Sequence, residues 1–208
     1  MSSSVPEQTP PGLPGGSSRQ QILNVAATRF LERGYNGTTL REIAAAVGMK
    51  AGSLYYHFPS KEALLLEILQ RGVDVVVDAF QATAESHRSS DPRTRFAAHV
   101  RAHFKALLDY RLPYTAVGIA TFYMAPESIR STYLSACAAY EEMWCDLLRE
   151  LQENGGITAD IPLEVATVAL FGAISFAVEW FPENRDLDTF AGAIAQTFWS
   201  GLSKGSPS

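Results

Sequence analysis

Apolar side chains recur every three or four positions along most of the chain, which is the period of an α-helix. In the first periodic segment, for example, Ile22, Ala26 and Phe30 fall on one stripe. From residue 19 onward no segment shows the sustained two-residue alternation of a half-buried strand, and no internal repeat is visible. The pattern predicts an all-α protein of about nine helices, without a sheet.

Glycine, proline and capping residues divide this pattern into helices. Thr38 or Thr39 is expected to cap the second helix, and Glu42, three positions after Thr39, completes a capping box. Ser60 and Asp91 are the caps expected for two later helices. The expected helices run over about 19–33, 40–47, 50–58, 61–86, 92–111, 113–124, 127–154, 162–181 and 187–202.

Composition limits the class of protein. Hydrophobic residues make up 47% of the 208 residues, enough to bury a core, whereas the Ser-, Pro- and Gly-rich segment 1–17 is predicted to be a disordered tail. Cys137 and Cys145 lie about 12 Å apart along one predicted helix, too far for a disulfide, which favours a reducing cytoplasm. No secretion signal is expected, because the N-terminal segment MSSSVPEQTPPGLPGGSS has no apolar run. No membrane span is expected either, because the longest apolar stretch, from Val165 to Val178, is shorter than about 20 residues.

The net charge of −5 is unevenly distributed. Residues 17–70 carry six basic and four acidic side chains, whereas residues 71–208 carry eleven basic and seventeen acidic ones. A mildly basic end on an acidic body lets that end approach a phosphate backbone while the remainder is repelled.

The segment TTLREIAAAVGMKAGSLYYHF, residues 38–58, has the organisation of a helix-turn-helix motif. Two short helices with apolar faces are joined by a turn that contains Gly48. In such motifs the second helix enters the major groove of DNA. Leu54 and Phe58 are expected to be buried, which leaves Tyr55 and Tyr56 on a solvated surface where core packing does not explain them.

The longer stretch GYNGTTLREIAAAVGMKAGSLYYHFPSKEALLLEIL resembles the DNA-binding domain of the tetracycline-repressor (TetR) family. The Gly-aromatic start, the Thr-Thr cap, the L-YYHF helix and the P-S-K-E-x-L opening of the next helix stand in the family's order. The resemblance covers about residues 18–69, and beyond them only the helical layout is similar. It implies a DNA-binding domain over 18–72 with its motif at 39–58, and a ligand-binding and dimerisation domain over 73–204.

The resemblance also implies DNA contacts. Lys61 matches a phosphate-clamping lysine, but Ala51 stands where the family commonly has lysine, and Lys50 precedes it. Alternatives remain open: Tyr56 packed between helices, Arg41 simply solvated, or His57 capping its helix. The residues expected to contact DNA are Thr39, Arg41, Lys50, Gly52, Ser53, Tyr55, Tyr56, His57 and Lys61.

Aromatic residues are dense in the middle helices, and this favours a pocket for an apolar small molecule, the expected effector. Arginines could meet an anionic end of such a ligand, although each is more often a surface residue. The residues expected to contact the ligand are Phe104, Tyr110, Tyr114, Phe122, Tyr123, Tyr140, Trp144 and Arg111.

Catalysis, cofactors and metals are not expected. The sequence offers no nucleophile–base pair, no phosphate-binding loop and no metal triad; His99 and His103 have the spacing of two ligands on one helix face, without an evident third.

The last two predicted helices are apolar on more than one face, which predicts a homodimer formed through them. The sequence therefore predicts a repressor that binds a pseudo-palindromic DNA operator as a dimer and is released by an apolar effector. The alternatives are an activator or co-repressor-dependent regulator of the same family, or an all-helical small-molecule binder without DNA activity.

Overall fold

The computed structural model describes residues 18–108, 113–121, 124–177 and 186–203. Within these ranges the chain is all-α and forms nine helices, as the apolar periodicity predicts. The predicted tail 1–17 and the expected ligand contacts Tyr110, Arg111, Phe122 and Tyr123 lie outside the described residues. The helices are α1 (Ser18–Arg33), α2 (Leu40–Ala46), α3 (Ala51–His57), α4 (Lys61–Ser86), α5 (Pro92–Leu107), α6 (Tyr114–Thr121), α7 (Glu127–Glu153), α8 (Leu163–Phe176) and α9 (Leu187–Leu202).

The predicted caps begin their helices. Thr39 caps α2 in a reciprocal capping box with Glu42, the Ser60 hydroxyl accepts a hydrogen bond from the Ala63 N–H, and Asp91 accepts one from the Thr94 N–H. After α1 the chain turns at Gly34, whose φ of 72° is a left-handed conformation that favours glycine. None of the described helices is long and apolar enough to cross a membrane.

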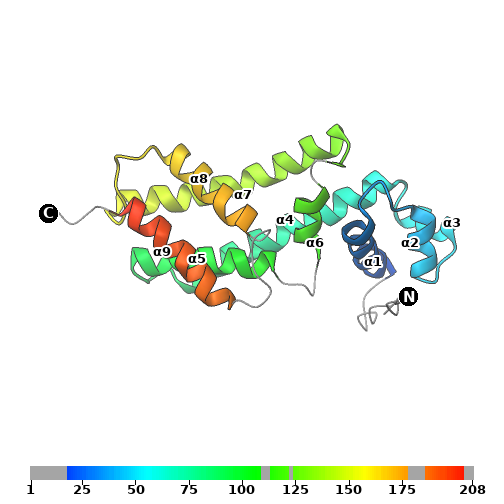
Figure 1. Cartoon of the computed structure of the whole chain (residues 1–208), viewed down its shortest axis with the longest axis horizontal. Helices are drawn as coiled ribbons and strands as arrows, with labels where there is room; N and C mark the ends of the chain where they lie inside the picture. The colour runs from blue at the N-terminus through cyan, green and yellow to red at the C-terminus, as the bar shows by residue number, and fades with distance from the viewer. Residues whose placement is uncertain (1–17, 109–112, 122–123, 178–185, 204–208) are drawn as a thin grey trace, which may run out of the picture.

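The molecule is elongated, and α4 connects its two parts (Figure 1). Helices α1, α2 and α3 form a small head at one end, and α5, α7, α8 and α9 pack as a bundle toward the other. Helix α4 begins in the head and runs into the bundle, where it packs against α5, α6 and α7. A movement of α4 would therefore displace residues packed against it in both the head and the bundle.

Two hydrophobic clusters form the core, and α4 contributes to both. The residues of α4 from Leu64 to Leu69 pack with α1, α2 and α3, whereas Val76 and Phe80 pack with the bundle. Helix α6 belongs to the first cluster, because Tyr114 and its neighbours pack with the head. The head is thus held to the body through α6 as well as through α4.

Helices α4 and α6 approach each other closely at Gly72, which is buried. A Cβ atom built there would lie 2.9 Å from the carbonyl oxygen of Tyr114, a backbone atom that cannot rotate away. Glycine at this position lets the two helix backbones touch.

We expect Gly72→Ala to lower the stability of the folded chain by about 1–3 kcal/mol, because the new methyl group overlaps the α6 backbone. Gly52→Ala is the matched control, since a Cβ at Gly52 meets no atom within 4 Å and alanine favours a helix. Urea unfolding followed by circular dichroism measures both variants. Equal stability of the two would contradict the close packing of α4 on α6.

Candidate DNA-binding face and ligand cavity

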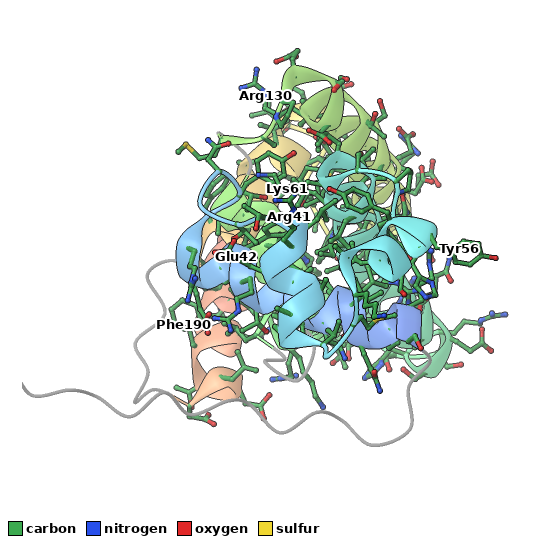
Figure 2. All side chains as sticks on the ribbon, turned by 90° about the vertical axis from the view of Figure 1, so that its right-hand side faces the viewer. Arg41, Glu42, Tyr56, Lys61, Arg130 and Phe190 are labelled. Carbon is green, nitrogen blue, oxygen red and sulfur yellow. The ribbon has the colours of Figure 1, made fainter. Side chains whose placement is uncertain are left out.

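Helix α3 is held by one face and exposed on the other. Leu54 is fully buried, and Phe58, which directly follows α3, is 1% exposed; both pack in the head cluster. On the opposite face Tyr55 is 47% and Tyr56 88% exposed, and the Tyr56 side chain points away from the molecule (Figure 2). The interpretation of Tyr56 as packed between helices is therefore wrong.

Arg19, at the start of α1, ties α3 to α4. Its guanidinium donates hydrogen bonds to the carboxylate of Glu67 and, at 2.8 Å, to the carbonyl oxygen of His57 at the end of α3. The same group lies over the ring of Phe58, 4.2 Å from its centroid. Burial alone would raise the pKa of Glu67, but the hydrogen bonds and charges of Arg19 and Arg71 outweigh it and lower that pKa. Arg19 therefore fixes the end of the exposed helix.

The other residues expected at DNA lie on the surface of the head. Arg41, Lys50, Gly52 and Ser53 are exposed, and Arg41 lies on α2 at the head end of the molecule (Figure 2). The Thr39 hydroxyl is exposed but already hydrogen-bonded: it accepts from the Glu42 N–H in the capping box and also donates to the Glu42 carboxylate at 2.7 Å. The hydrogen bonds from Thr39 are the main reason that the pKa of Glu42 is lowered.

Lys61 has an internal role that the sequence did not predict. Its ammonium nitrogen donates hydrogen bonds to the carbonyl oxygens of Tyr35, at 2.8 Å, and Thr38, at 3.0 Å, and lies 4.2 Å from the centre of the Tyr35 ring. Burial, together with the hydrogen bond to Glu62, raises the pKa of Tyr35 to about 12. Lys61 thus positions the turn between α1 and α2.

A cavity of about 360 Å³ lies in the body, within the range of small-molecule sites. It is surrounded by α4, α5, α6, α7 and α8, and its described lining carries no Asp, Glu, Lys or Arg. Leu134 and Phe176 are each 52% exposed, so the cavity reaches the surface between α7 and α8. The lining residues are Gly72, Val73, Val76, His103, Leu107, Thr115, Gly118, Ile119, Tyr133, Leu134, Cys137, Tyr140, Phe171, Ser175 and Phe176.

The polar groups of the lining are mostly satisfied within the protein. Thr115 donates a hydrogen bond to the Leu107 carbonyl oxygen at 3.2 Å. The Tyr133 hydroxyl lies where a Cβ of Gly118 would be, so this glycine makes room for it, and burial raises the pKa of Tyr133. His103, which is 3% exposed, has its Nδ1 atom 2.9 Å from the Tyr140 hydroxyl, and the two rings are stacked.

Two family profiles match most of the chain. The profile described as "Bacterial regulatory proteins, tetR family" matches residues 22–68, and "Tetracyclin repressor-like, C-terminal domain" matches residues 89–202. This chain belongs to the TetR family of bacterial regulatory proteins. The family membership implied by the Thr-Thr cap and the YYHF helix is confirmed, and the chain is a DNA-binding transcriptional regulator.

Characterised relatives match nearly the whole chain. The transcriptional repressor KstR2 of Rhodococcus jostii is 34% identical over 191 residues, which cover 88% of this chain and 90% of the relative. The transcriptional activator FasR of Mycolicibacterium smegmatis is 28% identical over 193 residues, which cover 92% and 85%.

Solved structures share the fold. The ketosteroid transcriptional regulator KstR2 of Mycobacterium tuberculosis has a TM-score of 0.76 at 24% identity, and the match covers 93% of this chain and 98% of that one. AibR, solved in complex with isovaleryl coenzyme A and operator DNA, has a TM-score of 0.73 at 22% identity, over 89% and 98%.

The described aromatic residues that we expected at the ligand lie in three places. Tyr140 lines the cavity of this TetR-family chain. Phe104 and Trp144 are fully buried in the core of the bundle and are not part of the lining. Tyr114 is buried against the head, where its hydroxyl donates to the Asn24 side chain and accepts from Gln20. The aromatic residues of the described middle helices therefore fill the core of the bundle as well as lining the cavity.

His99 and His103 do not form a metal site with any third ligand in the described residues. Both side chains are buried, and the His99 ring packs against Phe80, with 4.4 Å between the ring centres. Burial lowers the pKa of His99, and it lowers the pKa of His103 to about 3. Both imidazoles are therefore neutral at pH 7.

Helix α8 carries an apolar stripe on its exposed face. The stripe consists of Val165, Val168, Ala169, Gly172 and Phe176, with Val168 63% exposed. Helix α9 differs from the expectation, because its large apolar side chains, Phe190, Ile194, Phe198 and Trp199, pack against the bundle core. Its exposed positions hold small or polar residues, such as Ala193, Gln196 and Ser200.

We expect stability to fall as the pH drops from 7 to 5. The pKa of His103 is about 3 in the folded chain and about 6.5 when unfolded, so the unfolded state takes up a proton first. The contribution of the neutral His103 imidazole to the free energy of unfolding is therefore present above about pH 6.5. By pH 5 this contribution has fallen by about 2 kcal/mol. His103→Phe should reduce the pH dependence measured by urea unfolding. An unchanged slope in this variant would contradict a buried, neutral His103.

Proposed function

We propose that this chain is a repressor that binds a pseudo-palindromic operator as a homodimer and is released by a largely apolar small molecule bound in the body. One observation carries the DNA-binding part: Tyr55 and Tyr56 stand exposed on a short helix whose other face is anchored in the head core. The hydroxyl of an exposed tyrosine on such a helix suits a hydrogen bond to a phosphate oxygen, and its ring suits apolar contact with a thymine methyl group.

The contact face includes Thr39, Arg41, Lys50, Gly52, Ser53, Tyr55, Tyr56 and His57. Gly52 is exposed and has open space around it, which allows the backbone of α3 to approach a phosphate. Lys61, which two carbonyl groups hold in place, supports this face by fixing the turn before α2, and it has one further N–H to donate to a phosphate.

The dimer is proposed to form mainly through the α8 stripe, with α9 beside it. From Val165 to Phe176 α8 has no charged residue, so a two-fold copy of this face brings no like charges together. Four of the eight large apolar side chains that are exposed in the described residues lie on α7 and α8. Two subunits joined there would present two α3 helices to one operator.

The effector is proposed to be largely apolar, since the described lining of the cavity is uncharged and mostly aliphatic or aromatic. AibR, a structural neighbour, was solved with isovaleryl coenzyme A and operator DNA, which makes acyl thioesters the first compounds to test, beside hydrophobic acids and aromatics. A compound that raises the melting temperature but leaves the operator complex intact would contradict release.

The proposed coupling runs from the cavity to the head through α4 and α6. Gly72 of α4, together with Thr115 and Gly118 of α6, lines the cavity, and Tyr114 is hydrogen-bonded to α1. A ligand that spreads α4 and α6 would tilt the head and change the spacing of the two α3 helices. Such a ligand binds the state that does not fit DNA more tightly, which is the condition for release.

A regulator that activates transcription is the second candidate, favoured by the similarity to the activator FasR. We propose no catalytic activity. We also propose a location in the cytoplasm, since Cys137 and Cys145 are both free thiols, as is usual in a reducing compartment. A small-molecule binder without DNA activity would retain the cavity but fail the test that follows.

We expect Tyr56→Ala and Gly52→Ala each to weaken operator binding about tenfold or more, while Gln81→Ala, an exposed position on α4, leaves it unchanged. The operator is first obtained by selection of duplexes from a random pool with immobilised protein. Fluorescence anisotropy at several salt concentrations gives the affinities, which should fall steeply as salt rises. Wild-type affinity in both head variants would contradict this docking face.

Val168→Glu is expected to yield monomers, because it places a charge in the middle of the apolar stripe without touching the core of the subunit. Ala82→Glu, at an exposed position of α4, is the control and should leave the dimer intact. Sedimentation velocity at micromolar concentration measures both. A wild-type monomer, or a dimeric Val168→Glu variant, would show that the interface lies elsewhere or is absent.

A further inference from the structure

One residue that lines the cavity has a buried polar atom without a hydrogen-bond partner in the described residues. Among the buried side-chain nitrogen and oxygen atoms that lack a hydrogen-bond partner in the described residues, Nε2 of His103 is the one that belongs to the cavity lining. The ring is 3% exposed, and burial keeps it neutral. A buried polar atom without a hydrogen-bond partner raises the free energy of the protein, so a ligand that supplies this partner binds more tightly.

The partner on the other ring nitrogen determines what Nε2 offers. Nδ1 lies 2.9 Å from the Tyr140 hydroxyl, and the two rings are stacked with 9° between their planes. A phenol hydroxyl is a good donor and a weak acceptor, because its oxygen lone pairs are delocalised into the ring. The Tyr140 hydroxyl therefore donates to Nδ1, and the proton of the neutral imidazole stays on Nε2.

We infer that His103 is a specificity-determining residue that donates a hydrogen bond from Nε2 to a neutral acceptor oxygen, such as a ketone or thioester carbonyl, on an otherwise apolar ligand. Tyr140 is its positioning residue. This inference rests on the proposed ligand-binding function of the cavity. It narrows the ligand class, because a hydrocarbon of the same shape leaves Nε2 without a partner, and the uncharged described lining supplies no counter-ion for a carboxylate.

Two probes of matched shape test the inference: 2-decalone, which has a carbonyl group, and 2-methylenedecalin, in which a methylene group replaces the oxygen. Their binding is followed by tryptophan fluorescence, since Trp144 contacts the rings of His103 and Tyr140. We expect the wild-type protein to bind the ketone about tenfold more tightly than the alkene. Equal affinity for the two probes would overturn the inference.

Variants of His103 and Tyr140 test whether the preference for the ketone over the alkene depends on the N–H group at Nε2 of His103. His103→Phe should lose the preference for the ketone while keeping its affinity for the alkene, whereas His103→Gln, which retains an N–H donor, should recover part of it. Tyr140→Phe should weaken the preference, because Nδ1 then competes for the proton. A His103→Phe variant that still prefers the ketone tenfold would overturn the role of His103.

Nitrogen-15 spectra of histidine-labelled protein read the proton position directly. We expect the free protein to carry the His103 proton on Nε2, and the ketone to shift the Nε2 resonance more than the alkene does. A proton on Nδ1 would overturn the inference. Operator release, measured in parallel, separates the two proposals: a ketone that binds through His103 but leaves the operator complex intact contradicts the effector function and supports the inference.

Discussion

The contact between the backbones of α4 and α6 at Gly72 is the constraint on which the two parts of this protein depend. One side of this contact belongs to a helix that begins in the head, and the other to a helix whose first residue, Tyr114, is hydrogen-bonded to α1. Both helices also line the cavity. Because packed interiors shift between discrete arrangements rather than deforming smoothly, the proposed coupling would transmit a small change in the cavity to the head as a change in orientation.

The head and the cavity differ in their electrostatics. In the head, the Arg19 guanidinium donates hydrogen bonds to the Glu67 carboxylate and to the carbonyl oxygen of His57. In the cavity the described lining has no charged side chain, and its histidine is neutral. A charged group therefore helps to hold α3 in place, whereas in the proposed effector binding shape and single hydrogen bonds would control what the cavity accepts.

Local features were predictable from the sequence, and contacts between distant residues were not. Caps at Thr39, Ser60 and Asp91, and the extents of α4 and α9, follow from residue types a few positions apart. The contact of Lys61 with the turn before α2 joins residues 26 and 23 positions apart, which no periodicity reveals. Apolar periodicity also does not distinguish a side chain that fills the core, such as Trp144, from one beside a cavity, such as Tyr140.

Helix α3 has only seven residues, which is too short to be stable by itself in water. Its order comes from Leu54, Phe58 and the Arg19 hydrogen bond at its last carbonyl group. The helix is therefore a local unit whose opening free energy depends on how α1 and α4 hold Arg19 and Glu67 together. A shift of α4 that loosened this pair would make α3 fray, and DNA binding would then bear the entropy cost of ordering the helix again. A shift of α4 would thus weaken operator binding through a loss of order in α3, in addition to the proposed tilt of the head.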